Sequence, residues 1–423
     1  MAKQCTLQNF TAVFTSSRVR IRRKILTFCI FVLLVVTSLC IVDKYRSKRF
    51  CLDGTTNRGV KVTDYFGDNF TLYTRSNSNK AKCPPLPLAV PPDSNIFRCR
   101  WYHKPPAPCD FRLRARLSCT KSSPSILYEW VDLDAPPSTY AFDDQCLARV
   151  IAERCTEEGL IPRVVHYVNF GPRRLLFHTL LSVLSVLKFA QPCLVILHAD
   201  YLPYGSHWQA LVQLVPNLIH VNRTAPDAIF GHEINSAHHK SDVARLEAMI
   251  KFGGIYCDMD HIVLKPLHEV LQHTVVMGKE ESDAHFGNGF FLGKPDSIFL
   301  KLWYESYRTF DDKVWAYNSI LVPAKLYKER GVDLGVHVVD SFFRPDWCKA
   351  TEEFYENLYE WRNSYGVHLY HNGNRKFFTG RLDMFENSLG EITRYILFGR
   401  SYLCTGNKTV GEPVRMDVSG NVF

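Results

Sequence analysis

Between residues 161 and 260, apolar segments of strand length alternate with segments of helical periodicity, and the last apolar segment ends in two acidic residues. A strand–helix–strand order of this kind predicts an α/β fold with a mostly parallel sheet flanked by helices. The predicted strands are 161–171, 193–200, 218–222 and 255–260, and the predicted helices are 175–190, 207–215 and 236–254. Because ligands of such sheets bind beyond the carboxyl ends of the strands, we expect a site near residues 258–260.

One uncharged apolar run lies near the N-terminus, and the excess positive charge of the chain surrounds it. Residues 25–42 contain no charged side chain, and at about 1.5 Å per residue a helix of this length just spans a thin bilayer. Residues 1–49 contain ten of the 51 basic residues and one of the 42 acidic residues, so the rest of the chain has 41 of each. The net charge of +9 therefore gives no support for nucleic-acid binding.

The basic residues before this apolar run predict the topology of the chain in a membrane. By the positive-inside rule, residues 1–24 form a cytoplasmic tail and residues 25–42 form an uncleaved signal anchor, a single transmembrane helix. A cleaved signal peptide is the alternative, but the polar lead of 24 residues disfavours it. We therefore expect a single-pass type II membrane protein with residues 43–423 in the lumen of the secretory pathway.

Residues 43–160 are predicted to form a lumenal stem that is rich in Cys and Pro. The stretch CPPLPLAVPP at 83–92 is typical of a linker, and residues 142–158 have helical spacing. Eleven cysteines follow the apolar run, and in an oxidising lumen they favour disulfides over metal sites. Cys257, in an apolar strand, is the expected free thiol. The N-glycosylation sequons are Asn69, Asn222 and Asn407.

Two pairs of charged residues mark the expected site. Asp258 and Asp260 are two residues apart, so in an extended segment both carboxylates would face one side and could bind a divalent cation. A lone pair of this spacing is more often a solvated turn, but here it follows an apolar strand and a double glycine. Asp242 and Arg245 lie three residues apart on one face of the preceding helix, where the alternative is a surface ion pair.

The string SDVARLEAMIKFGGIYCDMDHIVLKPL (241–267) resembles the sugar-binding region, with its DxD motif, of a family of retaining glycosyltransferases. That family includes α-1,4-galactosyltransferase, α-1,4-N-acetylglucosaminyltransferase and the yeast Golgi initiating mannosyltransferase, and the chain is most similar to uncharacterised invertebrate members. The resemblance covers about residues 161–375, through GNGFFLGKP (287–295) and GVHLYHN (366–372). It implies a GT-A glycosyltransferase domain over 161–423 and residence in the Golgi membrane.

The resemblance also implies roles for individual residues. The donor sugar would meet Asp242 and Arg245, and Asp258 would bind the ribose or sugar. Asp260 would bind Mn²⁺ or Mg²⁺, which holds the diphosphate of a UDP-sugar, with His368 or His371 near the metal. The implied donor-binding residues are His166, Asn169, Ser241, Asp242, Arg245, Asp258 and Asn288. For either of the two C-terminal histidines the alternative is a satisfied loop histidine.

One residue departs from the family pattern. Members usually have Trp, which stacks on the uracil, at the position where this chain has Asn169. An amide stacks less well, so donor binding is expected to be weaker unless Tyr167 or Phe170 stacks on the base instead. The sequence shows no unambiguous nucleophile. The resemblance implies retention of configuration through front-face attack, in which the leaving-group phosphate takes the acceptor proton.

These observations predict a metal-dependent retaining hexosyltransferase that moves galactose or N-acetylglucosamine from a nucleotide sugar to a glycan or glycolipid. The alternatives are a catalytically inactive relative, which binds glycans or chaperones another transferase, and a nucleotide-sugar diphosphatase. Two aromatic side chains in loop-like segments, Trp315 and Trp347, are candidates for stacking on the acceptor.

Overall fold

A computed structural model describes residues 113–119, 126–132, 134–155, 159–280, 284–347, 349–378, 382–399, 401, 403–405 and 408–410. All of them belong to one unit of the chain, residues 61–423. The expected anchor at 25–42, most of the expected stem, Asn69 and Asn407 lie outside the described residues. Within the described ranges, no helix is both long enough and apolar enough to cross a membrane.

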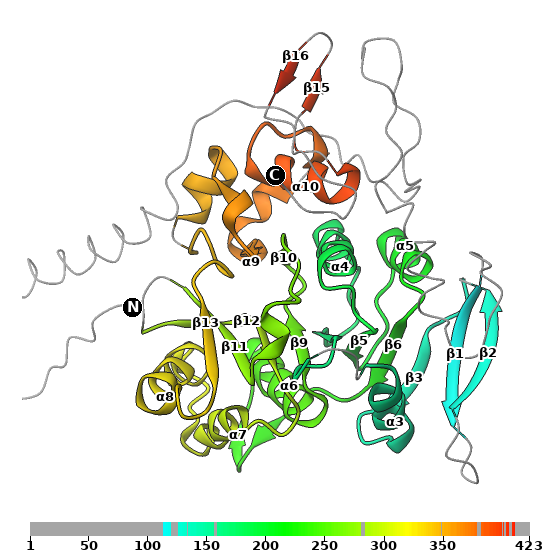
Figure 1. The fold of residues 1–423 in the computed structure, drawn as a ribbon, viewed down its shortest axis with the longest axis vertical. Helices are drawn as coiled ribbons and strands as arrows, with labels where there is room; N and C mark the ends of the chain where they lie inside the picture. Colours follow the sequence, from blue (N-terminus) through cyan, green and yellow to red (C-terminus); the bar gives the residue numbers. More distant parts are fainter. Residues whose placement is uncertain are drawn as a thin grey trace, which may run out of the picture. The chain divides into compact units, whose positions relative to one another are not determined.

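The fold centres on a sheet of eight strands, in which five of the seven neighbouring pairs are parallel (Figure 1). Across the sheet the strands are β13 (Val336–Val339), β11 (Val275–Lys279), β12 (Phe286–Gly293), β9 (Gly254–Cys257), β4 (Val164–Val168), β5 (Leu194–Ala199), β6 (Leu218–Asn222) and β3 (Ser138–Ala141). Strand β12 runs antiparallel to both of its neighbours. The predicted α/β fold with a mostly parallel sheet is confirmed.

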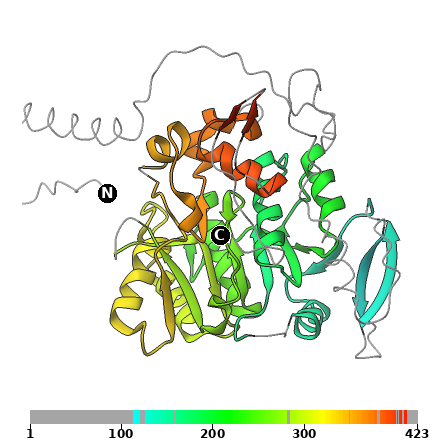
Figure 2. The same ribbon diagram turned by 45° about the horizontal axis from the view of Figure 1, so that its top comes forward.

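Helices cover both faces of this sheet (Figures 1 and 2). One face packs against α4 (Phe177–Phe189) and α5 (Ser206–Leu214), and α10 (Ser388–Phe398) packs on α4. The other face packs against α3 (Gln145–Arg154), α6 (Ala237–Phe252), α7 (Ile298–Glu305) and α8 (Val322–Arg330). The three helices predicted between residues 175 and 254 each match their observed bounds within two residues at either end.

Shorter elements complete the described chain. Four two-stranded sheets pair β1 (Leu113–Cys119) with β2 (Ile126–Asp132), β7 (Ala228–Ile229) with β8 (His232–Glu233), β10 (His261–Val263) with β14 (Gly366–His368), and β15 (Leu403–Thr405) with β16 (Lys408–Val410). The short helix α9 (His371–Asn374) follows β14. The pairing of β10 with β14 brings a distant segment of the chain beside the end of β9.

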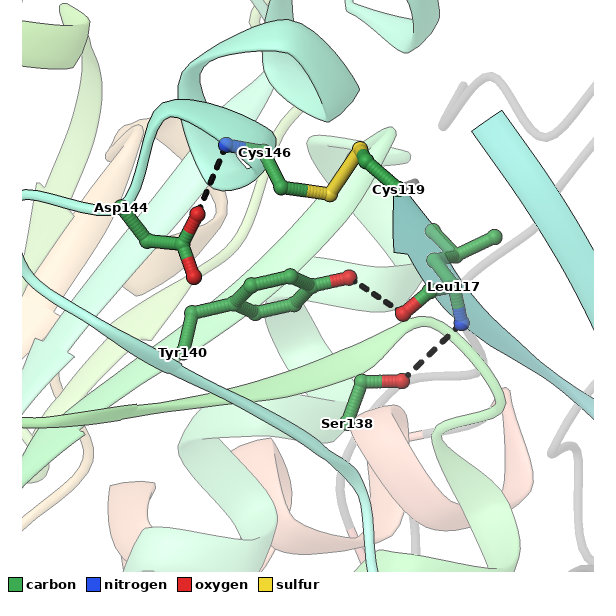
Figure 3. The surroundings of a disulfide bond; sticks show 6 residues. All are labelled: Leu117, Cys119, Ser138, Tyr140, Asp144 and Cys146. Atoms are coloured by element: carbon green, nitrogen blue, oxygen red, sulfur yellow. Dashed lines mark hydrogen bonds between the residues drawn. A yellow bond between two sulfur atoms is a disulfide. The ribbon is translucent and has the colours of Figure 1, made fainter. Parts of the chain in front are cut away.

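The folded domain begins well before residue 161, so the predicted boundary between stem and domain is too late. Strand β3 is the edge of the main sheet, parallel to β6. The disulfide between Cys119 and Cys146 joins β1 to α3, and Tyr140 Oη donates to Leu117 O at 2.5 Å (Figure 3). A four-residue edge strand gives little periodicity, and a disulfide replaces part of the apolar packing that sequence patterns reveal.

A second disulfide, between Cys155 and Cys193, links the end of α3 to the start of β5 across 38 residues. Among the described residues, Cys257 is the free cysteine, and it is buried, which confirms the prediction. One disulfide therefore attaches the end of α3 to the central sheet, and the other attaches the start of α3 to the two-stranded sheet of β1 and β2.

Replacing Cys155 and Cys193 together by serine should lower the free energy of unfolding by about 3 kcal/mol, because the bond restricts the unfolded chain. Denaturant unfolding of the oxidised full-length chain measures this change. Reduction of the wild type should cost at least as much, since it opens the Cys119–Cys146 bond as well. A double variant as stable as the oxidised wild type would contradict the expected contribution.

Candidate active and metal-binding site

The two acidic residues lie in a turn that follows β9 and leads into β10. The N–H of His261 donates to Asp258 O at 3.0 Å, which closes the turn. Ser182 Oγ, on α4, donates to His261 O at 2.6 Å and fixes the turn against the helix. Asp258 and Asp260 therefore converge as predicted, but through a turn and not through the alternation of an extended strand.

His368 completes a cluster with the two carboxylates, because its strand β14 pairs with β10. His368 Nε2 lies 3.1 Å from Asp260 Oδ1 and 3.8 Å from Asp258 Oδ2. The possible ligand atoms of the three residues all lie within 4.8 Å of one another. Two carboxylates and one imidazole fit Mn²⁺, and the oxygen donors also suit Mg²⁺, so the residues present fit the expected cation.

Asp260 and His368 stabilise each other's charged form. Burial alone would raise the pKa of Asp260, but the charge and hydrogen bond of His368 outweigh it and hold that pKa below its usual value. Burial alone would lower the pKa of His368, but Asp260 outweighs it, so the pKa of His368 is raised. Asp260 Oδ2 also accepts the backbone N–H of His371 at 2.8 Å.

The ring of His371 lies outside the three-residue cluster, although the sequence placed it among the candidate metal ligands. It stacks on His178 of α4 with 4.0 Å between ring centroids and contacts Phe378 edge-on. The structure thus gives His371 a backbone contact with Asp260 and a side chain in an aromatic stack.

Asp258 is oriented by two residues on the α6 side of the sheet. Tyr256 Oη donates to Asp258 Oδ1 at 2.6 Å, and Arg245 Nη2 lies 3.3 Å from the same oxygen. On the other oxygen, a Cβ added at Gly289 would lie 2.8 Å from Oδ2. Sequence reasoning missed Tyr256, although alternation within β9 places it on the face that leads to Asp258.

Arg245, Asp242 and Asn288 form a buried network beside Asp258. Arg245 Nη2 lies 3.3 Å from Asp242 Oδ1, and Asn288 Nδ2 donates to the same oxygen at 2.7 Å. Arg245 Nη1 donates to Asn288 O at 2.7 Å, and Nη2 donates to Ser241 Oγ at 3.1 Å. Burial raises the pKa of Asp242, and the charge of Arg245 opposes that rise. The surface ion pair, the alternative for this helix, is wrong because both side chains are buried.

A cavity of about 620 Å³ lies beside the acidic turn. Its wall includes Asp260 and Met259 from the turn, His178 from α4, and Asn169 from the loop after β4. The cavity therefore connects one carboxylate of the cluster with the residue that departs from the expected family pattern.

His166 is not brought to this cavity or to the cluster. Its side chain is fully buried, and its two nitrogens lie 3.0 Å from His198 Nε2 and 2.9 Å from Gly253 O. Burial lowers the pKa of His166 to about 4. With both nitrogens engaged inside the protein, His166 packs β4 against the end of α6, and the expected direct contact with a donor stays without structural support.

Of the three predicted glycosylation sequons, Asn222 lies among the described residues. It is exposed at the end of β6.

Replacing Tyr256 by Phe should weaken Mn²⁺ binding about tenfold, because the hydroxyl that orients Asp258 is lost. Titration calorimetry of the full-length chain with Mn²⁺ measures the affinity. Tyr304→Phe is the matched control, since Tyr304 Oη makes a similar bond of 3.0 Å to Glu247 Oε1 away from the turn. Equal affinities for wild type and Tyr256→Phe would show that this hydroxyl does not prepare the site.

Comparison with known proteins identifies part of this site. Residues 205–277 match the glycosyltransferase sugar-binding region containing the DXD motif. Glucan organizing enzyme 1 of Cryptococcus neoformans var. grubii is 30% identical over 233 residues, which are 50% of this chain and 63% of that protein. The chain thus spans less than two thirds of the length of this relative.

Solved glycosyltransferases also resemble the chain at low identity. The PaToxG glycosyltransferase is 17% identical, with 44% of this chain and 74% of that chain covered and a TM-score of 0.30. The galactosyltransferase LgtC, solved with donor and acceptor sugar analogues, is 13% identical, with 48% and 86% covered and a TM-score of 0.30. The matched region 205–277 includes Asp242, Arg245, Asp258 and Asp260, so these four residues lie where the chain is similar to a glycosyltransferase sugar-binding region.

Proposed function

We propose that this protein is a metal-dependent glycosyltransferase that moves a sugar from a nucleotide-sugar donor to a glycan or glycolipid acceptor. The observation that supports this most strongly is the cluster of Asp258, Asp260 and His368, of which Asp260 also lines a cavity of about 620 Å³. The match of residues 205–277 to a glycosyltransferase sugar-binding region covers the first two of these residues.

In the proposed arrangement, the diphosphate and the sugar of the donor are bound by different residues around the acidic turn. A cation held by the cluster would supply positive charge opposite the donor diphosphate. Asp242 and Arg245 would bind hydroxyl groups of the donor sugar, since both belong to the network that reaches Asp258. Because Arg245 is already held by Ser241 and Asn288, it would offer its charge without first losing side-chain freedom.

The finer features of this function rest on the sequence. We propose UDP-galactose or UDP-N-acetylglucosamine as donor, and transfer with retention by front-face attack, from the resemblance of residues 241–267 to the α-1,4-galactosyltransferase family. We also propose type II topology in the Golgi membrane, from the apolar run at 25–42 and its basic flank. The anomeric configuration of the product, measured by nuclear magnetic resonance, would test the retaining mechanism.

The full-length chain in detergent, supplied with Mn²⁺ and one nucleotide sugar at a time, should release free nucleotide from one donor and lose this activity with EDTA. Asp260→Asn should abolish release while the variant stays folded in thermal unfolding, because a neutral amide replaces a charged ligand of the cation.

Three results would contradict this proposal or narrow it. If the chain binds UDP but releases free nucleotide from no donor, the result would favour the alternative of a catalytically inactive relative. Sugar phosphate formed without an acceptor would favour a diphosphatase. Wild-type turnover by Asp260→Asn would show that the site is wrongly assigned.

Trp315 is the proposed platform for the acceptor sugar. It is 61% exposed, and the carbonyl of Trp315 lies 3.3 Å from Nε2 of His239, on the helix that also presents Asp242. Asp312 Oδ1 lies 2.7 Å from His239 Nδ1, and its carboxylate accepts the backbone N–H of Ser236. The loop that presents Trp315 is thereby fixed to the start of α6.

Replacing Trp315 by Ala should raise the KM for the acceptor about tenfold and leave the affinity for UDP unchanged, because a stacking surface for the sugar is lost. Trp347→Ala tests the other candidate: Trp347 is 49% exposed, and a raised KM in this variant alone would place the acceptor there instead. Steady-state kinetics with varied acceptor measure both variants. An unchanged KM in Trp315→Ala would remove Trp315 from the acceptor site.

A further inference from the structure

The side-chain amide of Asn169 is a polar group in the wall of the cavity beside the acidic turn. The residue is only 9% exposed, and its Nδ2 has no hydrogen-bond partner among the described residues. A buried amide N–H without an acceptor is costly, because it has lost its bonds to water and gained none in the protein. Such a group at a cavity wall indicates a ligand that supplies the missing acceptor.

Hydrogen bonds fix the backbone around Asn169. The N–H of Asn169 donates to His198 O at 2.9 Å, which continues the pairing of β4 with β5. Two residues later the N–H of Gly171 donates to Asp200 Oδ1 at 2.7 Å. These two bonds fix the backbone on which the side chain of Asn169 is presented to the cavity.

The position of Asn169 in the sheet relates it to the cation cluster. Strands β4 and β9 are parallel neighbours, with His166 opposite Tyr256. Beyond the ends of these two strands, Asn169 and Met259, the residue between the two acidic residues of the turn, line the same cavity. A ligand that reaches both Asp260 and Asn169 therefore crosses from the cation to the next strand of the sheet.

The rest of the cavity wall indicates the chemistry of that part of the ligand. Met259, Leu175 and Phe177 present apolar surface, which suits the faces of a planar ring. Arg173 and Arg375 add positive charge to the lining. Apolar surface and a buried amide donor in the same cavity suit a flat heterocycle with a carbonyl group, and the arginines suit the phosphates attached to it.

We propose that Asn169 Nδ2 donates a hydrogen bond to a ring carbonyl of the donor's nucleobase and so selects an oxo base, such as uracil, over adenine. This inference rests on the proposed function, because it assumes that a nucleotide occupies the cavity. It makes Asn169 a residue that determines the specificity for the base, with the cation cluster and the donor-sugar residues unchanged.

The test compares the affinities of UDP, ADP and pyrophosphate for the full-length chain in detergent with Mn²⁺, measured by titration calorimetry. Asn169→Ala should weaken UDP about tenfold and leave ADP and pyrophosphate within twofold, because adenine has no carbonyl and pyrophosphate has no base. Asn169→Asp keeps the shape of the side chain but replaces the donor by an acceptor, so it should weaken UDP at least as much.

Asn217→Ala is the matched control. Asn217 is 8% exposed, and its Nδ2 donates to Pro192 O at 3.0 Å, at the end of the sheet opposite the acidic turn. This variant should bind all three ligands as the wild type does. Thermal unfolding of each variant shows whether it is folded. If Asn169→Ala does not fold, the comparison of affinities is made with Asn169→Asp.

The outcomes separate this inference from the proposed function. If UDP binds the wild type in a metal-dependent manner and the Asn169 variants keep that affinity, the role of Asn169 is wrong and the proposed function stands. If Asn169→Ala weakens ADP or pyrophosphate as much as UDP, the contact is not with a base carbonyl and the inference falls. If UDP does not bind the wild type at all, the proposed function and this inference fall together.

Discussion

The buried guanidinium of Arg245 is the interaction on which the geometry of the site depends. A buried charge is tolerated only where opposite charges and hydrogen bonds compensate it. Arg245 lies between the carboxylates of Asp242 and Asp258 and donates to the backbone of Asn288. These contacts join α6, the end of β9 and β12, so two strands of the sheet and the helix that covers them are fixed at one point. Asp258 consequently has one oxygen engaged on the α6 side and the other directed toward His368.

Close approach of backbone segments is the second requirement of this site. Gly289 lets β12 pass beside Asp258, where a Cβ would lie 2.8 Å from the carboxylate. Gly253 and Gly254 have φ angles of 63° and 111°, a conformation that residues with side chains rarely adopt. This pair ends α6 and starts β9 within two residues, which brings Arg245 and Asp258 to the same end of the sheet. The double glycine is thus a geometric condition for the ion pair.

The sequence predicted the parts of the fold that depend on regular periodicity. The four strands and three helices between residues 161 and 260 were identified because each buries a continuous apolar surface. The segment around β3 was assigned to the stem, since a short edge strand tied by the Cys119–Cys146 disulfide has little periodicity of its own. The residues of the site were likewise predicted where regular spacing relates them and missed where it does not. Asp242 and Arg245 were paired through helix spacing, whereas the burial of His166 and the contact of Tyr256 with Asp258 depend on how separate elements pack.

The expected effect of Asn169 on donor binding differs between the sequence alone and the structure around the residue. From the sequence, an amide in place of an aromatic ring means only a weaker stacking surface. Stacking discriminates poorly between bases, because every base has a π face. A buried hydrogen-bond donor discriminates strongly, because a ligand without the matching acceptor leaves that donor unpaired. In the cavity beside Asp260, exchanging a ring for an amide would therefore give up part of the affinity for any nucleotide and gain selectivity for the base.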